Sequence, residues 1–217
     1  MSFSRYQRKD FIQSVYCYED SKVLINKLDI REEALLKEAD TEYSVQRLLE
    51  LAVQPVKGLF TINHLQNIHR YIFQDVYPFA GKLREEDISK GNTVFARSQH
   101  IKSYLSSILT KLKNESYLVG LPAHDFSIKV AYYMAEINII HPFREGNGRA
   151  TREFIRCLGL KCGYPLNWAR VNPDKLLQAS IQSISNTALW PNASWHAWRK
   201  MRYSFWLIRL FESCMVW

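Results

Sequence analysis

The sequence predicts an all-α fold, a helical bundle with one small β-hairpin. Apolar residues recur at steps of three and four over most of the chain, hydrophobic residues make up 47% of it, and only 8 glycines and 7 prolines interrupt 217 residues. The helical period is the main local signal, and this hydrophobic content supports a core of ordinary size. The length fits one domain, placed at residues 1–186 with an N-terminal extension; an atypical aromatic and basic segment, 187–217, follows it.

The helical period marks six stretches in chain order. They are expected at about residues 31–53, 61–76, 101–114, 123–140 and 147–160, and after Asn172–Pro173. Residues that punctuate helices support these limits. Thr61 is a suitable N-cap, Pro55 and Gly58 end the first helix, and Gly163 with Pro165 ends the fifth.

The pattern changes between the second and third helices. Lys82–Arg84 and Thr93–Ala96 suit two short extended arms, and Ile88–Asn92 between them is rich in turn formers. This is the one β-hairpin that the sequence predicts. No element is expected before Leu28, where aromatic residues such as Tyr16 should contact the domain.

Charge and composition exclude several classes of protein. The net charge is +8, but Lys and Arg are spread along the chain rather than gathered in a tail, so direct nucleic-acid binding is not expected. Four cysteines, Cys17, Cys157, Cys162 and Cys214, show neither a CxxC pair nor disulfide-like spacing, which favours reduced cytosolic thiols. No run of about 18 apolar residues and no signal peptide are visible, so no membrane span is expected. A cytoplasmic location is predicted, with secretion into a host cell left open.

The chemistry gathers in His141–Arg152, HPFREGNGRATR, between two helical patterns. Such a stretch is expected to be a loop that opens into a helix N-terminus, where backbone N–H groups and the helix dipole favour a phosphate. Gly146 would let the backbone approach a ligand closely. Arg149 and Arg152, with Arg156 on the same helical face, suit a polyphosphate better than a single carboxylate.

Two further residues of the stretch bear on the reaction. Glu145 is an acid among cations, and a carboxylate beside phosphates most often holds Mg²⁺. His141 is the residue able to take up a proton near neutral pH. Taken singly, a structural histidine and a helix-capping acid are the commoner interpretations, and Phe143 is expected to be a core anchor. Together these groups describe a nucleotide-dependent transfer to an incoming hydroxyl. Neither a Walker loop nor a kinase motif is present.

His141–Arg152 resembles the signature of the Fic family, HPFx(D/E)GNGRxxR, at every specified position. Tyr77–Arg84, followed by Ile88–Gly91 and Phe95–Ala96, looks like the flap of that family, and roughly residues 15–185 resemble its bacterial toxin branch. The resemblance implies a Fic fold, a helical bundle with a β-hairpin flap. The implied activity is adenylylation, in which AMP passes from ATP to a Tyr, Ser or Thr hydroxyl of a target protein and pyrophosphate is released.

The resemblance also implies a role for each matching position. His141 would be the general base, Glu145 the Mg²⁺ ligand, Gly146, Asn147 and Gly148 the anion hole, Arg149 and Arg152 the holders of the β- and γ-phosphates, and Ile88, Ser89, Lys90 and Gly91 the flap that pairs with a target strand. Lys90 and Gly91 are also expected at the nucleotide, although a solvated loop lysine is an equal alternative.

No glutamate of the chain follows a Ser or Thr by four residues, so the inhibitory motif (S/T)xxxE(G/N) of many Fic proteins is absent. The resemblance therefore implies a separate antitoxin that supplies the inhibitory helix. A topoisomerase subunit or a GTPase fits as the target protein. Three alternatives stay open at this point: a Fic-fold phosphotransferase, a catalytically silent protein-interaction module and, from the charge of +8, a nucleic-acid binder.

Overall fold

The structure is a computed structural model that describes residues 13–91, 93–172, 174–176, 178 and 215. Within these residues the helices are α1 (Glu33–Val53), α2 (Ile62–Phe73), α3 (Ile101–Asn114), α4 (Ala123–Ile140) and α5 (Asn147–Lys161), the strands are β1 (Ser89–Lys90) and β2 (Thr93–Val94), and short 3-10 turns lie at Ser98–His100, Ser116–Leu118 and Trp168–Arg170. The all-α prediction with one hairpin is confirmed.

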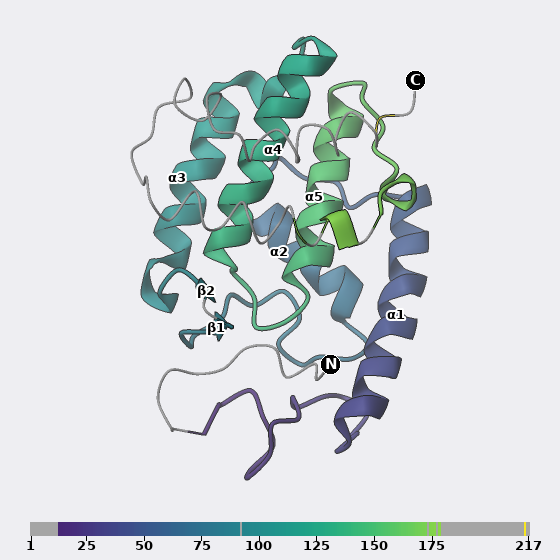
Figure 1. Ribbon diagram of the computed structural model, residues 1–217, viewed down its shortest axis with the longest axis vertical. Coiled ribbons are helices and arrows are strands. Elements are labelled where there is room, and N and C mark those ends of the chain that lie inside the picture. The colour runs from purple at the N-terminus through teal and green to yellow at the C-terminus, as the bar shows by residue number, and fades with distance from the viewer. Residues whose placement is uncertain (1–12, 92, 173, 177, 179–214, 216–217) are drawn as a thin grey trace.

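The five helices form a bundle with α2, α4 and α5 at its centre (Figure 1). α2 packs on α1 and α5, and α4 packs on α3 and α5. The largest fully buried side chains are aromatic: Phe73 on α2, Phe126 and Tyr133 on α4, Phe143 in the loop before α5 and Phe154 on α5. Because Phe143 is among them, the prediction that it anchors the loop in the core is confirmed.

Local sequence explains the helix limits. Thr61 caps α2 as predicted, since its side chain accepts a hydrogen bond from the His64 amide. α3 and α4 have the predicted bounds, and α1 begins slightly later than expected. α2 ends at Phe73 rather than near Val76, because the amides of Val76 and Tyr77 both turn back to the Phe73 carbonyl.

The hairpin differs from the prediction in its first arm. β1 pairs with β2 in antiparallel register, Ser89 opposite Val94 and Lys90 opposite Thr93, so the strands occupy the stretch that was predicted as the turn. Lys82–Arg84 is not a strand. The Arg84 amide instead donates to the Pro142 carbonyl at 2.9 Å, in the loop before α5.

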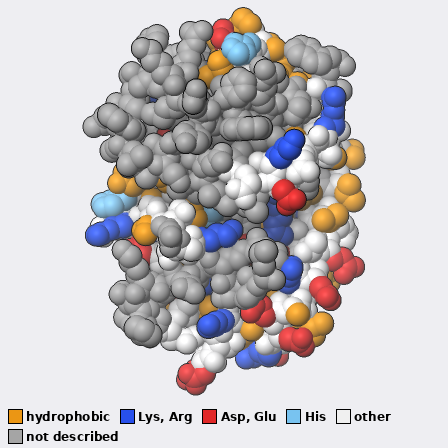
Figure 2. Space-filling view, in the orientation of Figure 1, with side chains coloured by type: hydrophobic (Ala, Val, Ile, Leu, Met, Phe, Trp, Pro, Cys, Tyr) orange, Lys and Arg blue, Asp and Glu red, His pale blue; other side chains and the backbone are white. Residues whose placement is uncertain are grey.

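The hairpin lies at the same end of the bundle as the loop between α4 and α5 (Figure 1). The N-terminal segment crosses this end as well, and Tyr16 packs edge-on against Phe79 with ring centroids 5.2 Å apart, as its predicted contact with the domain requires. On the face in Figure 2, Lys and Arg side chains are scattered among Asp and Glu. None of the described helices is both long and apolar enough to cross a membrane.

Beyond α5 the structure describes little of the chain. Gly163, with φ +78, follows the end of α5. The Asn172 amide oxygen accepts from the amides of Asp174 and Lys175, at 2.9 and 3.1 Å, which is the predicted cap. Most of that helix and of the segment 187–217 lies outside the described residues, and so does Cys214. Cys17, Cys157 and Cys162 are free thiols.

Candidate active site

The loop between α4 and α5 is held in a tight bend by its own residues. His141 ends α4 in the left-handed conformation, with φ 50 and ψ 62, and Gly146 caps α5 with φ 76. The Asn147 side chain closes the loop, because its Oδ1 accepts from the Phe143 amide at 2.8 Å and its Nδ2 donates to the Phe143 carbonyl at 2.7 Å. These two hydrogen bonds hold the loop in place and so fix the directions of the backbone amides in the first turn of α5.

Those amides are the candidate anion hole. A helix leaves its first N–H groups without intrahelical acceptors, and the helix dipole favours negative charge there. Gly148, in the first turn of α5, is exposed to solvent. Gly146 is tightly enclosed instead: an added Cβ would stand 2.2 Å from Cζ of Phe73. Only glycine therefore fits at this bend.

His141 has the geometry of a general base. Its Nδ1 lies 3.0 Å from the Asn138 carbonyl oxygen, which can only accept a hydrogen bond, so the neutral ring carries its proton on Nδ1 and its lone pair on Nε2. The Phe95 ring stacks on the imidazole at 3.8 Å. Burial lowers the pKa of His141 to about 3, so the imidazole ring is neutral at physiological pH.

Glu145 is the candidate metal ligand. Its Oε1 accepts from the Gly146 amide at 2.9 Å, and the same oxygen lies 3.9 Å from the Arg149 guanidinium. No group of three or more His, Cys, Asp or Glu side chains that could by itself hold a metal ion occurs in the described part of the chain. A cation at Glu145 would thus take most of its ligands from water and from a bound phosphate, which is how proteins usually hold Mg²⁺.

The three arginines of α5 have different surroundings. Arg149 donates to Oδ2 of Asp40 at 2.8 Å and to Oγ of Ser44 at 2.7 Å, both on α1. Arg152 is half-buried and makes no side-chain hydrogen bond to any described residue; burial lowers its pKa to about 10, which leaves it charged at neutral pH. Arg156 is turned away to Glu153 and the Leu51 carbonyl.

The expectation that Arg156 joins the other two arginines is therefore wrong. Its guanidinium links α5 to α1 through the Leu51 carbonyl, at 2.7 Å, and pairs with Glu153, also at 2.7 Å. Helical spacing places the three residues near one face, but it does not show that α1 covers the later part of that face. Arg149, although it too bonds to α1, and Arg152 lie in the first two turns of α5 and remain the candidate phosphate-binding cations.

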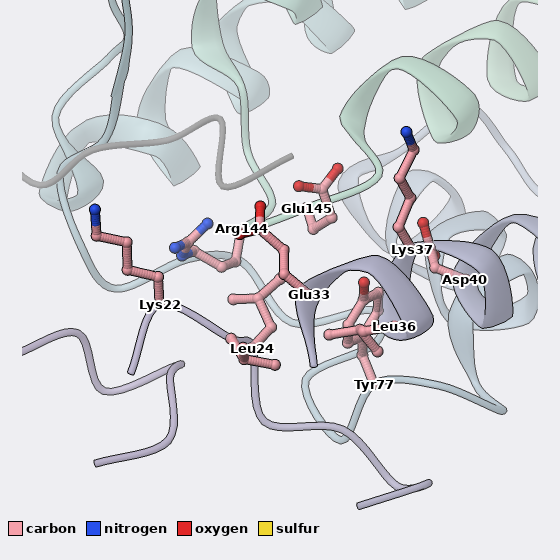
Figure 3. Close-up of a pocket in the computed structure, with 10 residues that line it drawn as sticks. Lys22, Leu24, Glu33, Leu36, Lys37, Asp40, Tyr77, Arg144 and Glu145 are labelled. Atoms are coloured by element: carbon pink, nitrogen blue, oxygen red, sulfur yellow. The ribbon is translucent and has the colours of Figure 1, made fainter. Parts of the chain in front are cut away.

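A depression lies beside the loop, between the N-terminal segment and α1 (Figure 3). It holds about 460 Å³ of free space, counting its open mouth. Its lining includes Lys22, Leu24, Glu33, Leu36, Lys37, Asp40, Tyr77, Arg144 and Glu145. Its lining holds three basic and three acidic side chains, so the depression has no strong preference for one sign of charge.

The β1–β2 hairpin, the candidate flap, lies next to His141. Ile88 and Phe95 are buried and pack with Ile139 of α4. Ser89 and Lys90 are half-buried, Gly91 is exposed, and the Lys90 charge helps burial to lower the pKa of His141. A second hollow of about 410 Å³, lined by Asp87, Ile88, Ser89, Val94, Phe95 and Arg97, runs along the hairpin.

One buried histidine of the site was not expected from the sequence. His69 of α2 stacks on Phe143 at 3.8 Å, accepts from the Gly81 amide at 2.8 Å, and donates through Nε2 to the Glu145 carbonyl at 2.9 Å. Burial lowers its pKa to about 3, which keeps the ring neutral. A signal was present, since this polar residue adjoins Ile68 on the apolar face of α2.

Comparisons with known proteins agree with this geometry. A sequence model of the Fic/DOC family matches residues 59–158, which run from just before α2 into α5. "Probable protein adenylyltransferase Fic" of Escherichia coli strain K12 is 37% identical over 166 residues, covering 76% of this chain and 82% of that protein. This chain belongs to the Fic/DOC family.

Other relatives extend the comparison of this Fic chain. "Protein adenylyltransferase VbhT" of Bartonella schoenbuchensis is 41% identical over 168 residues; the match covers 77% of this chain but only 35% of VbhT. The crystal structure of the N-terminal Fic domain of a VirB-translocated Bep effector from Bartonella quintana, with bound ADP, has a TM-score of 0.79 at 23% identity, covering 93% of this chain and 94% of that one. This likeness shows the Fic fold.

Proposed function

We propose that this chain is a protein adenylyltransferase that moves AMP from ATP to a Tyr, Ser or Thr hydroxyl of a target protein. The observation that carries the proposal is the buried, neutral His141, which carries its lone pair on Nε2 and begins the short loop that leads into the N-terminus of α5. A base next to a phosphate-binding helix end suits the transfer of a phosphoryl-type group to a hydroxyl. Relatives named protein adenylyltransferase, at 37–41% identity, support AMP as the transferred group.

In the proposed reaction the hydroxyl oxygen of the target attacks the α-phosphorus of ATP. Nε2 of His141 takes the hydroxyl proton, the new oxygen–phosphorus bond forms, and the bond from the α-phosphorus to the bridging oxygen breaks, so pyrophosphate leaves with that electron pair. The amides of Asn147 and Gly148 would stabilise charge on the phosphate oxygens, and the Gly146 amide would join them once it releases Oε1 of Glu145. Arg149 and Arg152 would hold the β- and γ-phosphates.

Glu145 would bind the Mg²⁺ of Mg·ATP, and its half-buried carboxylate beside the first turn of α5 suits that role. When bound, the ion would offset the charge of the phosphates as pyrophosphate departs. His69 would keep the Glu145 backbone in place through its hydrogen bond of 2.9 Å to the carbonyl. Asn147 would hold the other side of the loop through Phe143.

The flap would present the target. The flap consists of β1 and its two neighbours: Ile88, Ser89, Lys90 and Gly91. An extended target segment would add a strand to this small sheet, in the manner of β-augmentation. The hollow along the hairpin supplies apolar surface from Ile88 for such a segment. Lys90 and Gly91 would also lie near the nucleotide. A topoisomerase subunit or a GTPase fits as the target.

A separate antitoxin would restrain the enzyme. The chain lacks the inhibitory motif, and no described side chain bonds to the Arg152 guanidinium, which leaves it available to a glutamate from a partner. We infer a toxin of a toxin–antitoxin pair, or a related effector, that acts in the cytoplasm of the bacterium or of a host cell. Purification with a co-expressed helical partner that suppresses labelling would support this role.

Labelled ATP tests the proposed reaction. With Mg²⁺ and bacterial lysate, label from the α-phosphate should join a protein band, and His141→Ala should abolish it. His124→Ala is the matched control, because this exposed histidine lies in the first turn of the same helix, α4. Transfer of label from the γ-phosphate would show a phosphotransferase instead of an adenylyltransferase. Binding of Mg·ATP without any transfer would favour a catalytically silent interaction module.

A further inference from the structure

Arg84 is a buried cation whose guanidinium bonds only to backbone carbonyls among the described residues. The residue as a whole is 2% exposed. Nε donates to the His141 carbonyl at 2.8 Å, Nη1 to the Glu86 carbonyl at 2.6 Å, and Nη2 to the carbonyls of Ala96 and, at 3.2 Å, Ile140. No described carboxylate forms an ion pair with it.

These four carbonyls belong to two parts of the site. Ile140 and His141 are the end of α4 and the general base, whereas Glu86 and Ala96 lie on either side of the β1–β2 hairpin. The backbone of the same segment adds a further link, because the Ala96 amide donates to the Ile139 carbonyl at 3.3 Å. One planar guanidinium therefore joins both ends of the flap to the base.

The chemistry of this link is specific to arginine. A guanidinium directs five N–H donors in a fixed plane, so it can reach acceptors on several sides at once, whereas a lysine ammonium concentrates its donors on one nitrogen. Burial of an unpaired cation is costly, and burial lowers the pKa of Arg84 to about 10. A residue needed only to fill the space could be apolar.

The backbone that Arg84 holds is itself unusual. His141 has φ 50, a left-handed conformation that residues other than glycine rarely adopt without support. The bond from Nε of Arg84 ends on the carbonyl of this same residue. Phe95, which follows β2, stacks on its ring at 3.8 Å. The flap and the base are therefore connected through both the backbone and the side chain of His141.

We propose that Arg84 is a positioning residue that fixes His141 relative to the flap, so that a hydroxyl presented by the flap meets Nε2. The inference rests on the proposed AMP transfer and deepens it. Arg84 touches neither reacting atom; it acts through the His141 and Ala96 carbonyls. Loss of the Arg84 guanidinium should leave the phosphate-binding residues in place. It should disturb the alignment of His141 with the hydroxyl of the target.

The test compares Arg84→Lys with Arg156→Lys, which keeps the same charge but alters a guanidinium bound to α1 and Glu153. The probes are Mg·ATP, by calorimetry, and bacterial lysate with α-labelled ATP, with rates counted per folded molecule. Arg84→Lys should slow labelling about 10–100-fold, because small misplacements of catalytic groups are costly, even at saturating lysate. Its Mg·ATP affinity should stay within about twofold, and Arg156→Lys should label normally.

Two further readouts keep the test decisive. The imidazole ¹H and ¹⁵N signals of His141 should shift in Arg84→Lys and not in Arg156→Lys, and this reports the position of the ring without turnover. If Arg84→Lys does not fold, Phe95→Leu, which removes the stacking contact, should also slow labelling with Mg·ATP affinity retained. Equal labelling by Arg84→Lys and wild type, or unchanged His141 signals, overturns the inference, whereas an inactive wild type overturns the proposed function.

Discussion

Gly146→Ala is expected to destabilise the protein and to disable the anion hole through a contact that can be measured. The residue has φ +76, and an added Cβ would stand 2.2 Å from Cζ and 2.3 Å from Cε2 of Phe73. Carbon atoms in contact normally lie about 3.5–4.0 Å apart. Phe73 is fully buried, with the Arg149 guanidinium 4.5 Å from its ring centre and the His69 ring at 4.7 Å, so it has little room to retreat.

Two terms make up the expected cost. The left-handed backbone costs a residue with a Cβ about 1–2 kcal/mol, and forcing extra volume into a packed core costs about 1–3 kcal/mol. Their sum, about 2–5 kcal/mol, lowers Tm by roughly 4–20 °C for a chain of this size. Labelling of the target should fall at least about tenfold, because the amides of α5 move with the bend.

Gly120→Ala separates the two terms. Gly120 has φ +83, but an added Cβ would meet nothing within 4 Å. It should therefore cost only the backbone term of about 1–2 kcal/mol and leave labelling unchanged. Urea unfolding of both variants, and of Gly146→Ala combined with Phe73→Leu, gives the coupling between the two positions. Equal losses for the two alanine variants, or strict additivity in the double variant, would refute the reasoning.

Three other predictions concern charge. Asp40→Asn should lower the free energy of unfolding by about 1–3 kcal/mol in urea, because Asp40 is 8% exposed and its carboxylate holds Arg149; unchanged stability would contradict this. Burial lowers the pKa of His141 to about 3 from an ordinary 6.5, so the base stays neutral as the pH falls and kcat/KM should show no acid limb near pH 6.5. Arg152→Ala should weaken Mg·ATP binding by about 10–100-fold in calorimetry while AMP, which lacks the β- and γ-phosphates, binds within about twofold; equal losses would exclude its phosphate role.

The sequence could predict the helices and the loop between α4 and α5 because both signals are local. α4 shows its apolar period over consecutive residues, and its predicted limits are those observed. His141 and Gly146 lie five residues apart, so one short motif locates both ends of the bend before α5. The Thr61 cap is likewise a pattern within one helical turn.

Contacts between distant segments could not be predicted in the same way. The Arg149–Asp40 pair joins residues 109 positions apart, and the bond from Arg84 to the His141 carbonyl spans 57 positions. Periodicity records which face of a helix is apolar, but it does not say which partner covers that face. The error in the hairpin has the same origin, since Lys82–Arg84 looks like a short strand until the loop before α5 takes its amide.

The central claim, AMP transfer by His141, is tested most directly by mass spectrometry of lysate proteins after incubation with Mg·ATP and the enzyme. We expect an adenylyl group on a Tyr, Ser or Thr of at least one protein with wild type and with His124→Ala, and none with His141→Ala. A phosphoryl group on the same residue, or an adenylyl group that persists with His141→Ala, would contradict it.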